Sequence, residues 1–261
     1  MPVLYAQSRS RWLSVDRLSG TVTLQTSGSR SARVGDRLTT AGHGITTSRG
    51  ASAVLGIDIA IGSIVVAQST RLLIQRLTTL SDGAEVTILD VPRGQARIQT
   101  RSFNNPNSRL ELHTPSGVAA VRGTEFGVAV ADDGKTSIAT LEGKVDVIAQ
   151  LQSVAVDAGL TSIIYPGEPP TQPQSLDRDL DIELTAQGRR NGAFTVLGQI
   201  NPANTLLLDG KEVPIQRTGQ FETTIPSGSR NHEVEFVVRN ALGESRTHLI
   251  RQWRLWRLPR S

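Results

Sequence analysis

Apolar residues recur with a period of two along most of the chain. The period is clearest in five pairs separated by a single residue: Val22 and Leu24, Leu110 and Leu112, Val128 and Val130, Val145 and Val147, and Val154 and Val156. A strand that buries one face against a core has this period, because successive side chains point to opposite faces. Helical spacing is marginal at residues 71–80 and absent elsewhere. The pattern predicts an all-β protein.

Short glycine-containing steps separate the expected strands. Asp133-Gly134 lies between two alternating runs, and Asp-Gly supplies the positive φ angles of a two-residue type I′ hairpin turn. Glu142-Gly143 predicts a second turn of this kind. The most apolar stretch, residues 53–67, contains Asp58 and two glycines and is shorter than the roughly 20 residues that span a bilayer. We therefore expect two strands around a turn there, and no transmembrane segment.

Prolines concentrate between Tyr165 and Gln174, where they remove backbone donors and favour an extended, semi-rigid chain. We therefore expect a linker at residues 166–176. It would separate a first β domain at residues 15–165 from a second domain at residues 177–254, whose short and regularly spaced strands predict a small β-sandwich.

The most specific segment runs from Leu112 to Val130 and reads LHTPSGVAAVRGTEFGVAV. It fills a TP-x(5–6)-VRGT-x-F-x-V pattern with Thr114, Pro115, Val121, Arg122, Gly123, Thr124, Phe126 and Val128. This pattern resembles the periplasmic domain of FecR-type proteins, the iron-dicitrate sensors, and weaker likenesses extend it over residues 15–165. The resemblance implies a FecR-like β domain located in the periplasm or cell envelope.

The motif has two interpretations. In the structural one, Gly123 adopts a backbone conformation closed to other residues, Phe126 fills the core, and Arg122 stabilises the fold by pairing with a carboxylate or carbonyl. In the other, Arg122 and Glu125 belong to a surface that recognises a partner. The prevalence of Gly, Val, Thr and Phe favours the structural interpretation.

The second domain resembles bacterial Ig-like modules of the glucodextranase type over residues 178–252. The likeness rests on Asn201-Pro202, Asp209-Gly210, Gly219-Gln220-Phe221 and the segment 239–244. The resemblance implies an accessory module that serves as a spacer, an adhesion unit or a weak carbohydrate binder.

Composition offers no catalytic, cofactor-binding or metal-binding set. Cysteine is absent, and the four histidines at positions 43, 113, 232 and 248 lie too far apart in sequence for a short metal-ligand spacing. No GxSxG, GxxxxGK[ST], HExxH or CxxC motif occurs. The acidic triplet Asp177, Asp179 and Asp181 lacks the glycine and glutamate of an EF-hand. We expect no enzyme, no cofactor and no metal.

Each end of the chain carries an unusual feature of its own. Near the C-terminus, Trp253, Arg254, Trp256 and Arg257 interleave aromatic and cationic side chains, a combination that can grip an anionic surface, a sugar or a single-stranded nucleic acid. The alternative is a last strand that runs into a tail. A net charge of only +4 argues against nucleic acid, while peripheral membrane contact stays open. At the N-terminus, Leu4-Tyr5-Ala6 resembles the tail of a signal peptide, although no complete one is present.

Two functions remain. The first is a non-enzymatic binding or scaffold protein of the cell envelope whose partner is an envelope protein or a cell-wall glycan. The alternative is a periplasmic sensor component of an envelope signalling system that acts with a separate regulator chain. FecR-family sensors carry an anti-sigma segment and a membrane helix before this domain, and the sequence shows neither, so we transfer no sigma-factor or siderophore role. The sequence leaves the ligand and the oligomeric state open.

Overall fold

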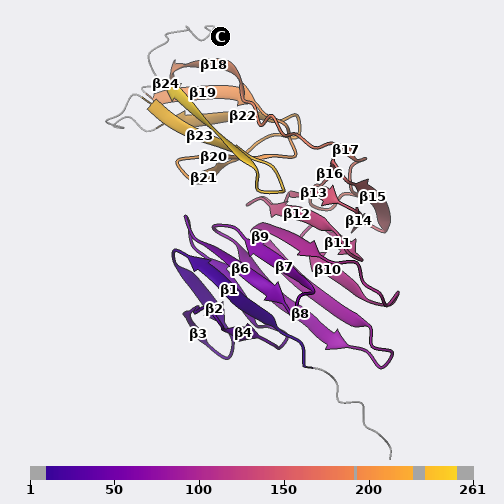
Figure 1. Cartoon of the computed structure of the whole chain (residues 1–261). Coiled ribbons are helices and arrows are strands. Elements are labelled where there is room, and N and C mark those ends of the chain that lie inside the picture. The colour runs from indigo at the N-terminus through magenta and orange to yellow at the C-terminus, as the bar shows by residue number, and fades with distance from the viewer. Residues whose placement is uncertain (1–9, 191–192, 226–232, 252–261) are drawn as a thin grey trace, which may run out of the picture. The chain divides into compact units, whose positions relative to one another are not determined.

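Every regular secondary-structure element in the described part of the chain is a β-strand. The computed structural model describes residues 10–190, 193–225 and 233–251 (Figure 1). The predicted all-β fold class is confirmed. The chain divides into two compact units, Met1–Ser175 and Leu176–Ser261. Within the described ranges, no helix has the length and apolarity that crossing a membrane requires.

The first unit consists of two sheets that share the long strand β9 (Glu85–Thr100). Sheet A has the order β4 (Arg37–Leu38), β1 (Leu13–Ser19), β6 (Ser52–Ile57), β7 (Gly62–Val66), β9, β12 (Glu125–Val130), β13 (Thr136–Glu142), β16 (Leu160–Ile164) and β17 (Gln174–Ser175). Sheet B has the order β3 (Ser29–Ser31), β2 (Val22–Gln25), β5 (Gly44–Thr47), β8 (Arg71–Thr79), β9, β10 (Arg109–His113), β11 (Val118–Val121), β14 (Lys144–Ala149) and β15 (Gln152–Asp157). Of these pairings, only β9 with β10 is parallel.

Strand β9 changes sheets at Gly94. Residues before it pair with β8 and β10 in sheet B, and residues from Gly94 onward pair with β7 and β12 in sheet A. Gly94 has a φ of +87°, and a Cβ there would lie 2.4 Å from the Thr70 hydroxyl oxygen. A glycine is therefore required, because both the backbone conformation and the close approach of Thr70 exclude a side chain.

After β9 the chain alternates between the sheets one hairpin at a time. β10–β11 lies in sheet B, β12–β13 in sheet A, β14–β15 in sheet B and β16–β17 in sheet A. The steps Arg122-Gly123-Thr124 and Gly143 are therefore crossings between sheets. The hairpin turn predicted at Glu142-Gly143 is wrong, because β13 and β14 belong to different sheets.

The turn at Asp133-Gly134 does close a hairpin, but it is not type I′. A type I′ turn needs positive φ at both central residues, and only Gly134 has it. The Gly134 N–H donates to the Ala131 carbonyl, and the Ala131 N–H donates to the Lys135 carbonyl. These bonds describe a longer loop, a type I turn followed by a glycine bulge.

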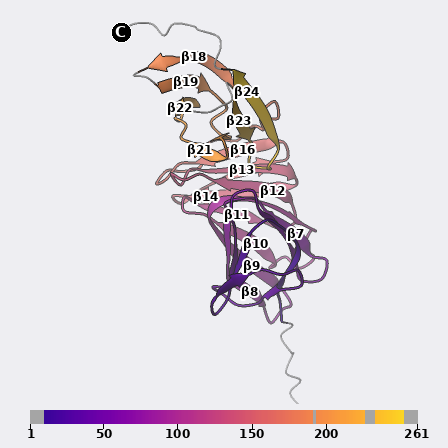
Figure 2. The same cartoon turned by 90° about the vertical axis from the view of Figure 1, so that its left-hand side faces the viewer.

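A single apolar core fills the space between the two sheets. Leu13, Leu55, Ile98 and Val147 are at most 1% exposed, and Phe126 is the largest of the fully buried side chains in this unit. Figure 2 shows the strands of the first unit from a second direction, with β7 of sheet A and β10 of sheet B labelled. Alternate burial along strands such as β14 produces the period of two seen in the sequence.

The marginal helix at residues 71–80 is instead strand β8. Leu72 and Ile74 are buried in alternation, and the strand pairs with β5 and with β9. Pairing on both edges supplies hydrogen bonds and burial that outweigh a weak local preference for helix.

Much of the proline-rich segment, expected to be a linker, is hydrogen-bonded to the first unit. The Thr171 N–H donates to the Ile163 carbonyl, the Ser162 hydroxyl donates to the Thr171 carbonyl, and Gln174 pairs with Thr161. Thr171 and β17 therefore attach this segment to the edge of sheet A, because its non-proline residues still provide donors and acceptors.

The second unit consists of one three-stranded and one four-stranded sheet. The first has the order β18 (Glu183–Arg190), β19 (Ala193–Gln199) and β22 (Gln220–Ile225), and the second has the order β21 (Lys211–Val213), β20 (Thr205–Leu208), β23 (Glu233–Arg239) and β24 (Ser245–Arg251). Their core includes Val196, Phe221 and Phe236, and the two phenylalanine rings lie 6.1 Å apart. Apolar residues from both sheets thus share one core, as in a β-sandwich.

Candidate functional site

The FecR-like motif begins in a hairpin turn of sheet B and crosses into sheet A. Thr114 and Pro115 follow β10, and the Thr114 hydroxyl donates to the Gly117 carbonyl at 2.9 Å while it accepts the Gly117 N–H at 3.2 Å. Val121 ends β11 and is 3% exposed. After the crossing, Phe126 lies in β12 with no exposed surface. Val121 and Phe126 therefore pack in the core, whereas Pro115 is exposed.

Gly123 makes the crossing sterically feasible. Its φ is +125°, and a Cβ at this position would lie 2.3 Å from Ser102 Cα. Two hydrogen bonds join the crossing to the end of β9 and the loop after it: the Thr100 N–H donates to the Thr124 carbonyl at 3.0 Å, and the Phe103 N–H donates to the Arg122 carbonyl at 3.1 Å. Two backbone segments are thus in direct contact, which only glycine permits.

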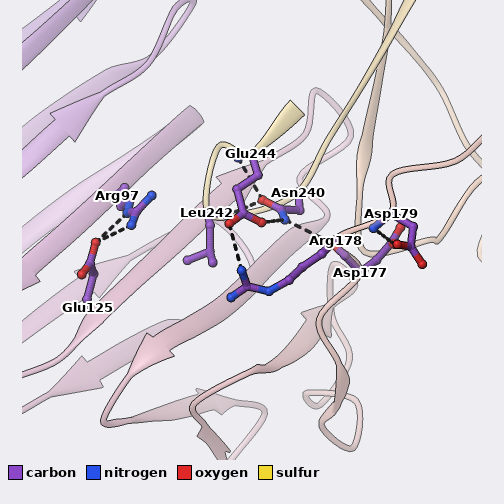
Figure 3. Close-up of polar contacts among 8 residues, drawn as sticks. All are labelled: Arg97, Glu125, Asp177, Arg178, Asp179, Asn240, Leu242 and Glu244. Atoms are coloured by element: carbon purple, nitrogen blue, oxygen red, sulfur yellow. Dashed lines mark hydrogen bonds and ion pairs between the residues drawn. The ribbon is translucent and has the colours of Figure 1, made fainter. Parts of the chain in front are cut away.

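The two charged residues of the motif have different surroundings. Glu125 accepts two hydrogen bonds from Arg97 on the neighbouring strand β9, at 2.8 Å from Nε and 2.5 Å from Nη2 (Figure 3). Arg122 is exposed, and within the described residues its guanidinium has no hydrogen-bond or ion-pair partner. The carboxylate pairing expected of Arg122 is therefore made by Arg97 instead.

A cleft of about 660 Å³ opens beside this crossing. Its lining residues come from the ends of four adjacent strands of sheet A and the loops next to them: Ala60, Ile61, Gly62, Ser63, Gln99, Thr100, Arg101, Ser102, Gly123, Thr124, Glu125, Glu142 and Gly143. Register explains why they meet, because Gly62 pairs with Thr100 and Glu125 pairs with both Gln99 and Glu142. Three residues of the motif thus lie in the wall of a concave surface.

One polar atom of this wall is buried without a partner. The Thr124 hydroxyl oxygen has essentially no solvent exposure and makes no hydrogen bond, whereas the Thr124 N–H has a distant acceptor in the Thr100 hydroxyl, at 3.4 Å. Buried polar groups in native proteins are nearly always paired, because an unpaired one loses its hydration without compensation.

Sequence reasoning missed Arg97, Arg101 and Glu142. Each is separated from the motif by many residues, and no local pattern distinguishes them from ordinary exposed positions of a strand or loop. Their place beside the motif follows from the pairing of β9 and β13 with β12. Only the pairing itself could have identified them.

Within the acidic triplet at residues 177–181, Asp177 has a structural role as a hydrogen-bond acceptor. Asp177 accepts backbone N–H groups of Asp179 and Leu180 through Oδ1, and the Asn204 side chain donates to its Oδ2 at 2.6 Å. The buried Asn240 side chain donates to the Asp177 carbonyl (Figure 3). Asp177 is thereby engaged, and among the described residues no cluster of His, Asp or Glu side chains could hold a metal.

A second ionic cluster lies on β10. Glu111 accepts a hydrogen bond from Arg109 at 2.7 Å, and its other carboxylate oxygen lies 2.9 Å from His113 Nε2. Partial burial raises the pKa of Glu111, but the hydrogen bonds with His113 and Arg109 together outweigh it, so this pKa lies below its ordinary value. The cluster therefore favours the ionised carboxylate.

The remaining candidates, Trp253, Arg254, Trp256 and Arg257, lie outside the described residues, as do Leu4, Tyr5 and Ala6. Their predicted roles stay predictions.

In comparison with known protein families, residues 45–146 match the family model described as "FecR protein". No curated protein matches the chain. Two solved structures of a protein proposed to be an anti-sigma factor from Parabacteroides distasonis are similar, at 13% and 15% identity with TM-scores of 0.41 and 0.40. The match covers 51% of this chain and 59% of each of those chains, so this chain spans well under two thirds of their length. At these scores the likeness supports no statement about function.

Proposed function

We propose that the first unit is the non-enzymatic, periplasmic sensory part of an envelope signalling system and that it acts by binding a separate regulator chain. The FecR family domain at residues 45–146 is the observation that carries this proposal, since its span includes the whole motif. The family match favours this function over the scaffold role that the sequence suggested first. The β-sandwich of the second unit would then act as a spacer, in line with its resemblance to Ig-like modules.

The division of roles within the motif supports a partner-facing surface. Gly123 and Phe126 hold the crossing in place through close backbone contact and core packing. Arg122 projects from this fixed crossing as an exposed side chain. A guanidinium has five N–H donors, and arginine is among the residues that contribute most to binding at protein interfaces. A rigid support also lowers the entropy lost when that side chain is ordered by a partner.

A capture experiment from envelope extract tests the proposal. The full chain is compared with Arg122→Ala and with Arg17→Ala, a matched control in which an exposed arginine of β1 without a side-chain partner in the described residues is removed. We expect the wild type and Arg17→Ala to retain the same single membrane protein, and Arg122→Ala to lose it without a change in melting temperature.

Two outcomes would contradict the proposal. Retention by purified peptidoglycan with no co-purifying protein would support the glycan-binding scaffold instead. Equal capture by Arg122→Ala would show that the motif does not face the partner.

A further inference from the structure

We propose that the cleft beside the motif binds a short peptide with free termini, its carboxylate held by Arg101 and its ammonium group by Glu142. This inference rests on the proposed function, because it names the class of ligand that the sensory unit detects.

The cleft contains charges of both signs that the protein leaves unpaired. Arg101 and Glu142 are exposed, and neither side chain has a hydrogen-bond or ion-pair partner in the described part of the chain. The third charged residue of the lining, Glu125, is already neutralised by Arg97. One cationic and one anionic group are therefore available to a ligand, which matches a zwitterion and not a simple anion or cation.

Neutral hydrogen-bonding groups complete the wall. Ser63, Gln99 and Ser102 line the cleft, and their side chains have no partner among the described residues. The backbone N–H groups of Ser102 and Gly123 likewise donate to no acceptor there. Donors and acceptors in this mixture complement the carbonyl and amide groups of a peptide backbone.

The Thr124 hydroxyl gives an independent indication that a polar partner is missing. It is covered from solvent and unpaired, although Thr124 is one of the lining residues. Thr124 thus combines a place in the wall of the cleft with a hydroxyl for which the described part of the fold supplies no partner.

The wall is already formed without a ligand. A Cβ at Gly62 would lie 2.2 Å from the Gln99 carbonyl oxygen, and one at Gly123 would lie 2.3 Å from Ser102 Cα. Such close backbone packing leaves little room for the wall to rearrange, and a preformed site avoids much of the cost of ordering on binding. The volume of about 660 Å³ lies in the range of small-ligand sites, roughly 300–1,000 Å³.

The lining argues against two other ligand classes. Sugars and nucleobases are commonly held by stacking on aromatic rings, and the cleft has no aromatic residue in its lining. A peptide needs no such platform, since charges and hydrogen bonds suffice to orient it.

The test is a titration of the ¹⁵N-labelled full chain, followed by the backbone amide resonances of Ser102, Gly123 and Gly143. The probes are trialanine, N-acetyl-trialanine amide, which lacks both terminal charges, inorganic phosphate and N-acetylglucosamine. We expect saturable shifts at these amides with trialanine, and at least tenfold weaker binding of the capped peptide. Arg101→Ala and Glu142→Gln should each weaken trialanine binding at least tenfold, whereas Arg17→Ala should not change it.

Thr124→Val separates a ligand-binding hydroxyl from a structural one. We expect it to weaken trialanine binding and to leave the melting temperature unchanged or raised, because the lost hydroxyl has no partner in the fold. Thr140→Val is the matched control: the Thr140 hydroxyl donates to the Val156 carbonyl at 2.9 Å, so its loss should lower the melting temperature.

Four results would overturn the inference: equal binding of the free and capped peptides, saturation by N-acetylglucosamine or phosphate instead, no saturable shift at the cleft amides, or a lowered melting temperature for Thr124→Val. None of them bears on capture of the regulator chain through Arg122, so failure of this inference is distinguishable from failure of the proposed function.

Discussion

Replacement of Phe126 by alanine is expected to destabilise the first unit severely, while replacement of Arg122, four residues earlier, is expected to do almost nothing. Phe126 has no exposed surface and belongs to the core between the two sheets. An aromatic side chain buries about 150–250 Å², which at roughly 25 cal/mol per Å² corresponds to about 4–6 kcal/mol. Alanine retains part of this, so a loss of about 3–5 kcal/mol is expected, in line with other buried Phe→Ala changes.

A loss of this size is a large share of the unit's stability. Single domains unfold with a free energy of roughly 5–15 kcal/mol, and for a domain of this length each kcal/mol lowers the melting temperature by about 2–4 °C. Phe126→Ala should therefore melt about 6–20 °C below the wild type. Phe126→Leu leaves a smaller cavity and should lose less.

For Arg122 the structure reverses what the sequence suggested. A structural arginine would destabilise the fold when removed, but the Arg122 side chain is exposed and makes no polar contact in the described residues. Surface substitutions of this kind change stability by about 0.5 kcal/mol or less, so Arg122→Ala should melt within about 2 °C of the wild type.

Differential scanning calorimetry of the full chain resolves these effects, with a urea melt as a second measurement. The transition of the second unit, which does not contain Phe126, should keep its midpoint in every variant and serves as an internal control. A loss below about 1 kcal/mol for Phe126→Ala would refute the placement of this ring in the core. Early melting of Arg122→Ala would restore the structural interpretation of that residue.

Three further predictions concern the backbone, the pH dependence and the boundary between the units. Gly123→Ala combines a positive φ with a Cβ 2.3 Å from a neighbouring backbone atom, so it should lower the free energy of unfolding by several kcal/mol in a urea melt. Gly159→Ala has a φ of +79° but open space around the new Cβ, so it should lose only about 1 kcal/mol. Equal losses would contradict the close contact at Gly123. The pKa of Glu111 is lowered in the folded state, so the stability that its ionised carboxylate contributes is present above the unfolded pKa of about 4.3 and is lost as the pH falls through the folded pKa. Glu111→Gln should therefore flatten the fall in melting temperature below about pH 4.5, and an unchanged slope would refute this prediction. Limited proteolysis should cut close to the boundary at Ser175 and Leu176, beyond the residues hydrogen-bonded to sheet A, and leave two folded fragments. A single resistant core across that boundary would contradict the two-unit division.

Local patterns were sufficient for the fold class and for several individual strands. The period of two depends only on which side chains face the core, so Val145 and Val147 indicate a strand without knowledge of its partners. The same holds for residues 53–67, which form β6 and β7 as expected. Local patterns failed at Gly143, because a glycine with positive φ suits a hairpin turn and a crossing between sheets equally well.

The sequence by itself therefore determined that the chain is all-β, that residues 112–130 carry a FecR-like motif, and that Phe126 is a candidate for the core. Only the tertiary structure decided which charges meet. Arg97 reaches Glu125 and Glu142 faces the same cleft because β9, β12 and β13 pair in one particular register. Register is set by burial across the whole sandwich, a cooperative property that no short segment encodes.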